Sequence, residues 1–359
     1  MKEKLYPFHV AILIFMTQTG VVIFSLPRVV AEKYGYNGWI VLFLFAGIST
    51  FNIFLIALVY RLGKGRSIFE ILEQSLSKFL LYPLYLILIS VWAVLGCTVA
   101  KQYVIIFQML VFPTTHPMLF KFFIDILIFL LVIKGIYTIS KATTIFFWLI
   151  IWMMLIHLFF IKDFEFVRLT PFIFQGDTDM IMGGLDIYTA FIGYELALIL
   201  IPFAKKNTKF MRAIYIGNLF TFATYLPLCI ISFGFYSFGQ LTRMKYPLLE
   251  MLSYMRLPFI ERIEIFLFGF LLFSIVVTSV MYIWAAMETL RRIIPKAKTK
   301  WLAAIILCAS FFVAWIPDIL NEVEEWIRVV GYIETGIAFG LPIILITILL
   351  IQKGVKNNA

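Results

Sequence analysis

The sequence has few charged residues, few histidines and few cysteines. Asp, Glu, Lys and Arg make up 14% of the 359 residues, whereas soluble globular proteins carry about a quarter. The cysteines are Cys97, Cys229 and Cys308, and the histidines are His9, His116 and His157. Both sets are scattered, and each cysteine lies inside an apolar run, so we expect neither a disulfide framework nor a metal site. No histidine is placed for catalysis.

Motifs for nucleotide chemistry and hydrolysis are also missing. The sequence contains no GxxxxGK[ST] phosphate loop, no HExxH zinc motif and no nucleophile elbow. We therefore expect no enzyme activity, no cofactor and no ATP-driven step. The formal net charge of +10 does not indicate nucleic-acid binding, because the basic residues lie in short loops between apolar runs, a pattern typical of membrane topology.

Apolar residues dominate the rest of the sequence. They account for 63% of the chain and give a mean hydropathy of +1.00. No single core could bury this much apolar surface, so lipid must solvate much of it. The apolar run near the start is too long for a cleaved signal peptide and lacks a cleavage site, so it is interpreted as the first membrane helix.

Runs long enough to cross a bilayer recur along the whole chain. A helix needs about 20 residues to cross roughly 30 Å of hydrocarbon, and the runs lack the two-residue alternation of barrel strands. The sequence therefore predicts an all-α polytopic membrane protein with about ten transmembrane helices and no soluble domain. The predicted spans are 8–30, 38–60, 80–111, 119–135, 142–161, 183–204, 212–238, 263–290, 301–317 and 331–351.

Loop charges predict the orientation of these spans. With the N-terminus inside, the inside segments hold 19 of the 30 basic residues, while the outside segments hold nine and most of the acids. This bias predicts that both termini lie on the cytoplasmic side. The chain, 1–359, then forms one transmembrane domain. Its halves, about 8–161 and 183–317, have inverted topology, and the last helix, 331–351, follows them.

One broken-helix signature occurs in each half. The first span has Gly20 in mid-run and Pro27 after it, and the sixth span has Gly193 in mid-run and Pro202 after it. Paired interruptions of this kind point to the binding site of transporter-like proteins. The alternative is that Gly and Pro are simply common in membrane helices.

An unwound membrane helix frees backbone groups that hydrocarbon cannot satisfy. A zwitterionic amino acid fits such a site, because its carboxylate binds N–H groups and its ammonium binds carbonyls. The expected pocket has Thr19, Gly20 and Val21 on one side and Ile192, Gly193, Tyr194 and Glu195 on the other. Further candidates for its wall are Thr98, Ser274, Thr278 and Phe191. Hydroxyls in membrane helices usually bond their own backbone, which is the alternative for the first three.

Glu195 is the strongest single candidate for a functional side chain. A charge near the middle of an apolar span costs at least about 2.5–3.5 kcal/mol, so its side chain should face the bundle interior or water. It could accept a hydrogen bond from a ligand ammonium, carry a proton, or tie two helices together. Lys101, in the third span, is hypothesised to pair with it, because a lysine stem can reach inward.

Four segments in this order resemble the B subunits of spore nutrient-germinant receptors: QTGVVIFSLPRVV, FIGYELALILIPF, PFIERIEIFLFGFLL and WIPDILNEVEEW. That family belongs to the amino acid–polyamine–organocation transporter superfamily. The resemblance covers nearly the whole chain and rests on length, helix count and motif order. No single motif is diagnostic.

The resemblance implies a LeuT-like fold of ten helices in a 5+5 inverted repeat, with helices 1 and 6 broken at Gly20 and Gly193. It implies an inner spore membrane location and a complex with an A-type subunit and a lipoprotein C-type subunit. The implied function is to bind a small nutrient, often an amino acid, and trigger germination. No residue identifies the ligand, and the fifth span lacks the lysine that some proton-coupled relatives carry.

Two other functions stay open at this point. The first is an amino-acid permease that works by alternating access, and the second is a membrane scaffold with a vestigial site. Saturable, gradient-dependent uptake by the chain alone would favour the permease. Loss of nutrient-specific germination in assembled variants of Gly193 or Glu195 would argue against the scaffold.

Overall fold

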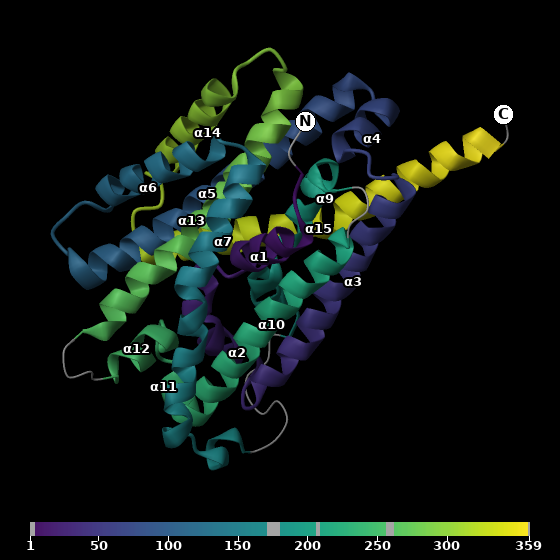
Figure 1. Ribbon diagram of the computed structural model, residues 1–359. Helices are drawn as coiled ribbons and strands as arrows, with labels where there is room; N and C mark the ends of the chain where they lie inside the picture. Colours follow the sequence, from purple (N-terminus) through teal and green to yellow (C-terminus); the bar gives the residue numbers. More distant parts are fainter. Residues whose placement is uncertain (1–3, 171–179, 206–208, 256–261, 358–359) are drawn as a thin grey trace.

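The computed structural model describes residues 4–170, 180–205, 209–255 and 262–357, and within these ranges the chain is helical apart from loops and one isolated bridge between Leu5 and Ala204. Helices of very different length cross one another in one bundle (Figure 1). Six of them are long and apolar enough to cross a membrane. They are Gly38–Leu62, which contains α3 (Val41–Leu62); α5 (Lys78–Val111); Ile136–Asp163, which contains α7 (Ile136–Ile150); α10 (Phe210–Phe235); α13 (Ile263–Ile293); and Leu320–Lys353 of α15 (Leu320–Asn357).

Two further helical segments, Ile181–Phe191 and Tyr194–Phe203, are together long and apolar enough for a span and meet at a bend of 52°, as in a broken span or a re-entrant loop. Shorter apolar helices occupy three other predicted spans, and these are α1 (Pro7–Gln18), α6 (Pro117–Val132) and α14 (Thr299–Val313). The remaining helices are α2 (Leu26–Tyr34), α4 (Ile68–Ser75), α8 (Met180–Tyr188), α9 (Ala197–Leu200), α11 (Phe238–Leu241) and α12 (Pro247–Ser253).

The prediction of a helical, multi-pass membrane protein is confirmed by these spans. The count of ten spans and the 5+5 repeat remain predictions, because α1, α6 and α14 are each shorter than a full bilayer crossing. The start of the segment PFIERIEIF, up to Glu261, lies outside the described residues.

Large apolar side chains cover the outside of the bundle. Phe79, Phe312 and Trp301 are 86%, 70% and 67% exposed. A soluble monomer rarely exposes apolar patches larger than a few hundred Å². These side chains are therefore expected to face lipid, where an apolar surface disrupts no hydrogen bonds.

Close helix contacts hold the middle of the bundle together. α5 crosses α13 at Gly96, where an added Cβ would lie 3.1 Å from the carbonyl oxygen of Ser279. α1 crosses α10 at Gly217, where an added Cβ would lie 2.7 Å from the carbonyl oxygen of Ala11. Small residues let membrane helices approach this closely. These two crossings form the packed centre in which the interrupted spans lie.

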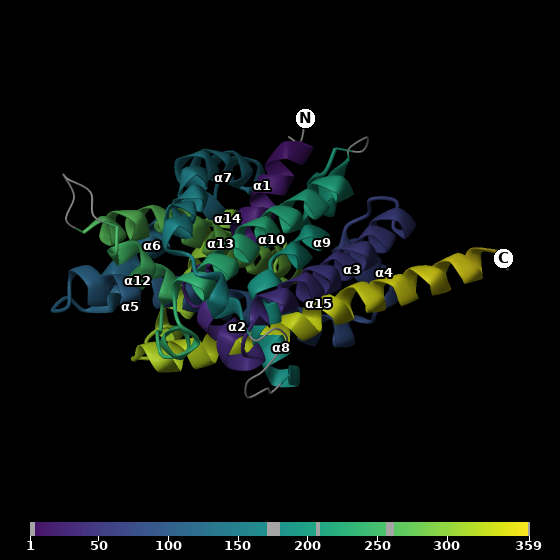
Figure 2. The ribbon, with the colours of Figure 1, turned by 90° about the horizontal axis from the view of Figure 1, so that it is seen from below.

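α15 lies beside α3 (Figure 2). Asn52 of α3 donates to the carbonyl oxygen of Ala338 of α15 at 3.0 Å and to the hydroxyl of Tyr194 at 2.8 Å. One amide therefore connects α15 with the bent span.

Candidate functional site

The first span is interrupted at Thr19 and Gly20. α1 ends at Gln18, and the chain passes through a 3₁₀ turn, Val21–Phe24, into α2. Pro27 lies in the first turn of α2, where its missing N–H costs no helical hydrogen bond. The predicted break near Gly20 is confirmed.

Hydroxyl groups of α13 satisfy carbonyls that this break leaves free. Thr278 Oγ1 lies 3.2 and 3.1 Å from the carbonyl oxygens of Met16 and Thr17 and can donate to either. The hydroxyl of Ser274 donates to the carbonyl oxygen of Thr19. In hydrocarbon these carbonyls would otherwise lack a donor. The hydroxyls of Ser274 and Thr278 are therefore engaged in hydrogen bonds to the backbone of the first break.

The sixth predicted span is interrupted at Gly193. α8 continues as a 3₁₀ turn, Thr189–Phe191, and after Gly193 the chain resumes as the turn Tyr194–Leu196 and α9. Gly193 has a φ of 119°, a conformation that residues with a Cβ rarely adopt. The glycine thus permits the change of direction, and this predicted break is confirmed too.

Polar side chains of α1 and α10 join the two breaks. Gln18 Nε2 donates to the carbonyl oxygen of Phe191 at 2.6 Å, and Thr221 donates to Gln18 Oε1 at 2.8 Å. The hydroxyl of Tyr225 lies 3.0 Å from the carbonyl oxygen of Gln18 and 3.2 Å from that of Ala190. Gln18 and Tyr225 are not among the predicted site residues, although a polar side chain within an apolar span is a usable signal.

A cavity of about 420 Å³ lies between the two breaks. Gly20 and Val21 line it from the first break, and Ile192 lines it from the second. Thr278 and Tyr282 of α13 line its wall. Its charged lining residues are Arg28, Glu32, Lys33, Asp186, Glu324, Glu325 and Arg328. The cavity lining therefore combines residues of both breaks, hydroxyl groups and charges of both signs.

Part of the predicted pocket lines this cavity and part does not. Gly20, Val21, Ile192 and Thr278 line it, whereas Thr19 and Ser274 line a separate, mostly apolar cavity of about 60 Å³. The other six predicted residues are buried in the packed interior, and these are Thr98, Lys101, Phe191, Gly193, Tyr194 and Glu195. The hydroxyl of Thr98 donates to its own helix, at the carbonyl oxygen of Val94, 2.8 Å away.

The hypothesised pair between Lys101 and Glu195 does not form. Lys101 Nζ lies 3.2 Å from Met118 Sδ of α6. Glu195 accepts from the backbone N–H of Gly193 at 2.6 Å and from the hydroxyl of Tyr282 at 3.0 Å. The hypothesis is wrong because the rotation of α5 about its own axis, which span length and loop charge do not define, turns Lys101 toward α6.

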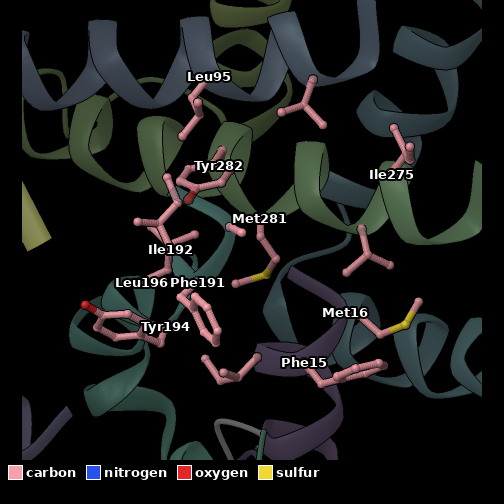
Figure 3. Close-up of a cluster of buried hydrophobic side chains, with 14 of the residues drawn as sticks. Phe15, Met16, Leu95, Phe191, Ile192, Tyr194, Leu196, Ile275, Met281 and Tyr282 are labelled. Carbon is pink, nitrogen blue, oxygen red and sulfur yellow. The ribbon is translucent and has the colours of Figure 1, made fainter. Parts of the chain in front are cut away.

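Side chains of the second break pack among those of α1 and α13 (Figure 3). Phe191 is fully buried, and its ring meets that of Tyr225 edge-on, with the centroids 5.6 Å apart. The hydroxyl of Tyr194 bonds that of Tyr188 at 2.5 Å. Tyr282 both lines the cavity and donates to Glu195, so its hydroxyl connects the cavity wall with that carboxyl.

A second cavity, of about 1180 Å³, lies at the start of α5 and the end of α13. Its charged lining residues are Lys4, Glu70, Glu73, Lys78, Lys134, Glu288, Arg291 and Arg292. On α13, Trp284 lies between Tyr282 of the first cavity and Glu288 of the second, and it is 1% exposed. Its ring packs edge-on against Phe203 with centroids 5.7 Å apart. Buried, packed side chains such as Trp284 therefore occupy the part of α13 between the residues that line the two cavities.

Two solved transporters share this fold. MhsT, in complex with L-phenylalanine, aligns with a TM-score of 0.66 over 97% of this chain and 89% of its own, at 12% identity. Mhp1, a nucleobase-cation-symport-1 family transporter with bromovinylhydantoin bound, aligns with a TM-score of 0.60 over 89% of this chain and 74% of its own, at 13% identity. The fold and the interrupted spans thus define a multi-pass membrane protein with the fold of these transporters.

The sequence defines the family within that class. The profile described as "Spore germination protein" matches residues 4–323, and the chain belongs to this family. Spore germination protein GerQB of Bacillus cereus is 25% identical over 332 residues, which cover 91% of each chain. Spore germination protein A2 of Bacillus subtilis (strain 168) is 24% identical over 99% of this chain and 98% of its own. The family resemblance seen in the four segments is confirmed.

Proposed function

We propose that this chain is the B-type subunit of a spore nutrient-germinant receptor, and that a small zwitterionic nutrient, such as an amino acid, binds in the 420 Å³ cavity to trigger germination. The observation that carries the proposal is the position of this cavity, which meets interrupted main chain at Gly20 and Ile192. Transporters with broken helices bind their substrates at such interruptions. Ten spans in two inverted halves are part of the same proposal.

The lining of the cavity supports a ligand of this chemistry. The main chain at Gly20 and the polar side chains of Thr17 and Thr189 can meet its charged ends. Val99 and Ile192 offer apolar surface for its side chain. Apolar surface beside a few placed polar groups is typical of small-molecule sites.

Binding must favour one arrangement of the helices if it is to act as a signal. Gln18 bonds across from the first break to the second, so a ligand that touches both breaks can change how the two spans meet. Under this proposal, A-type and C-type receptor subunits in the inner spore membrane respond to that change. The ligand-binding roles of the six buried candidates then become indirect, through the packing of the second break.

A ligand-protection screen on the purified chain tests the proposal. The thermal unfolding midpoint is measured with amino acids and sugars for the wild type, for Gly20→Ala and for the control Gly47→Ala. An added Cβ at Gly20 would lie 3.6 Å from Thr278 Oγ1, so alanine fits but takes space from the cavity, whereas at Gly47 no atom lies within 4 Å.

We expect one nutrient class to raise the midpoint of the wild type and of Gly47→Ala, and to raise that of Gly20→Ala less. The reason is that a ligand stabilises the folded state by RT ln(1 + [L]/Kd), so weaker binding gives less protection. Equal protection of all three proteins, or none by any compound, would contradict binding in this cavity.

The permease alternative is favoured by one observation, the second cavity at the start of α5 and the end of α13. A carrier needs access to its site from each face in turn, so the packed region around Trp284 would have to rearrange. Saturable uptake of a labelled, protecting nutrient into vesicles that hold this chain alone would favour the permease. Protection without uptake would favour the receptor.

A further inference from the structure

Two carboxyl groups lie together in the interior, next to the second break. Glu334, on α15, is 0% exposed and Glu195 is 4% exposed. Their side chains are close enough to share a hydrogen bond. Trp92 Nε1 of α5 donates to Glu334 Oε1 at 2.9 Å, but Glu334 Oε2 is buried and no described residue donates to it.

We propose that Glu195 and Glu334 form a proton-binding site, in which a proton held between the two carboxyl groups ties α15 to the second break. Ionised carboxylates only accept hydrogen bonds, so two of them can bond each other only through a proton. Two adjacent buried negative charges would also repel each other strongly, because little water is present to screen them.

The described side chains around the two carboxyl groups supply hydrogen-bond donors but no positive charge. From α13 the hydroxyl of Tyr282 donates to Glu195, and from the second break Tyr194 lies close to it. The other titratable neighbour is Tyr188 of α8, which bonds Tyr194. Among the described residues, no Lys, Arg or His lies within ion-pairing distance of either carboxyl. No cation of the protein therefore compensates a second negative charge here.

The site is connected to the cavity through Tyr282. Its hydroxyl is bonded to Glu195, and its side chain lines the cavity wall. A group that enters the cavity and takes the hydroxyl as its own donor would remove one donor from Glu195. The affinity of the pair for its proton then rises, and by reciprocity the proton changes the affinity for the ligand. Loss of the proton would weaken the contact between α15 and the turn Tyr194–Leu196 of the second break.

Infrared spectroscopy of the purified, membrane-reconstituted chain tests the inference, because a protonated carboxyl has a carbonyl stretch that is distinct from the bands of a carboxylate. The variants are Glu334→Gln, Glu195→Gln and the double variant Glu195→Gln/Glu334→Gln. The matched control is Glu264→Gln, since Glu264 is nearly buried but ion-paired with Arg262 at 2.9 Å. Thermal unfolding of each variant establishes that it is folded.

At neutral pH the wild type minus the double variant should show the loss of one protonated carboxyl per chain, and the control should show no such loss. Each single variant should remove or shift the same band, because the remaining carboxyl loses its partner. A wild type without this band, a double variant that keeps it, or a single variant that leaves it unshifted would overturn the inference. No nutrient is present in this experiment, so its outcome is independent of the proposed function.

Discussion

At the scale of single residues, the backbone conformation and the close packing at Gly193 both favour glycine. Its φ is 119°, and an added Cβ would lie 3.1 Å from Thr17 Cγ2 and 3.2 Å from the Thr17 carbonyl carbon. Gly193→Ala should therefore lower the free energy of unfolding by about 1–3 kcal/mol, because the backbone is strained and the first break must shift. Chemical or thermal unfolding in detergent measures this.

The control for this change is Gly269→Ala on α13. No atom lies within 4 Å of the added Cβ there, and the residue is helical. Alanine in a helix interior is favoured over glycine by roughly 0.5–1 kcal/mol, so this variant should be unchanged or slightly more stable. Equal losses of unfolding free energy in both variants would show that the backbone at Gly193 does not require glycine.

The hydroxyl of Thr278 stabilises the first break by donating to its backbone carbonyls. Thr278→Val keeps the shape but removes the donor shared by the carbonyls of Met16 and Thr17. Leaving a buried acceptor unsatisfied costs about 1–3 kcal/mol, so the unfolding midpoint should fall. In the control Thr347→Val, the lost hydroxyl is exposed and bonds its own helix at Ile343, so little change is expected. A Thr278→Val midpoint equal to that of the wild type would argue against this role.

At the scale of helices, α6 carries a buried ion pair between two of its own residues, one helical turn apart. Lys121 Nζ lies 2.5 and 2.6 Å from the two carboxylate oxygens of Asp125, with the lysine side chain 0% exposed. Asp125→Leu alone should destabilise the chain by about 3–5 kcal/mol, because the lysine charge stays buried without its partner. Unfolding by denaturant measures the loss.

The double variant Lys121→Met/Asp125→Leu separates the charge from the packing. Two apolar side chains of similar volume usually replace a buried ion pair with little loss, so most of the stability should return. A double variant as unstable as Asp125→Leu would mean that α6 depends on the pair itself.

The interruption of two helices could be predicted from the sequence. The side chains that contact these interruptions could not. Gly20 and Gly193 are visible because glycine and a following proline weaken a helix locally, whatever surrounds it. Which side chains meet across the bundle depends on helix rotation and tilt. Lys101 therefore turns toward α6, and Glu334, inside a predicted span of ordinary appearance, becomes the neighbour of Glu195.

Across the whole molecule, the two charged cavities lie at different levels along α5 and α13. Thr278 and Gln102, in the middle parts of these helices, line the smaller cavity, whereas Lys78 at the start of α5 and Arg292 at the end of α13 line the larger one. Five basic residues line the larger cavity, together with three glutamates. Excess positive charge on one face is the mark of the cytoplasmic side. The smaller cavity, where the nutrient is proposed to bind, would then open to the opposite side.

Cysteine labelling in intact cells that express the chain tests this orientation. Cys308 is exposed and is first replaced by alanine. With a reagent that does not cross membranes, Lys298→Cys, which follows α13, should react only after permeabilisation. Lys162→Cys, near the end of the span that contains α7, should react in intact cells. The reverse pattern would place the larger cavity outside. A nutrient arriving from outside would then enter the larger cavity, which is not lined by Gly20 or Ile192, and direct sensing through the smaller cavity would fail.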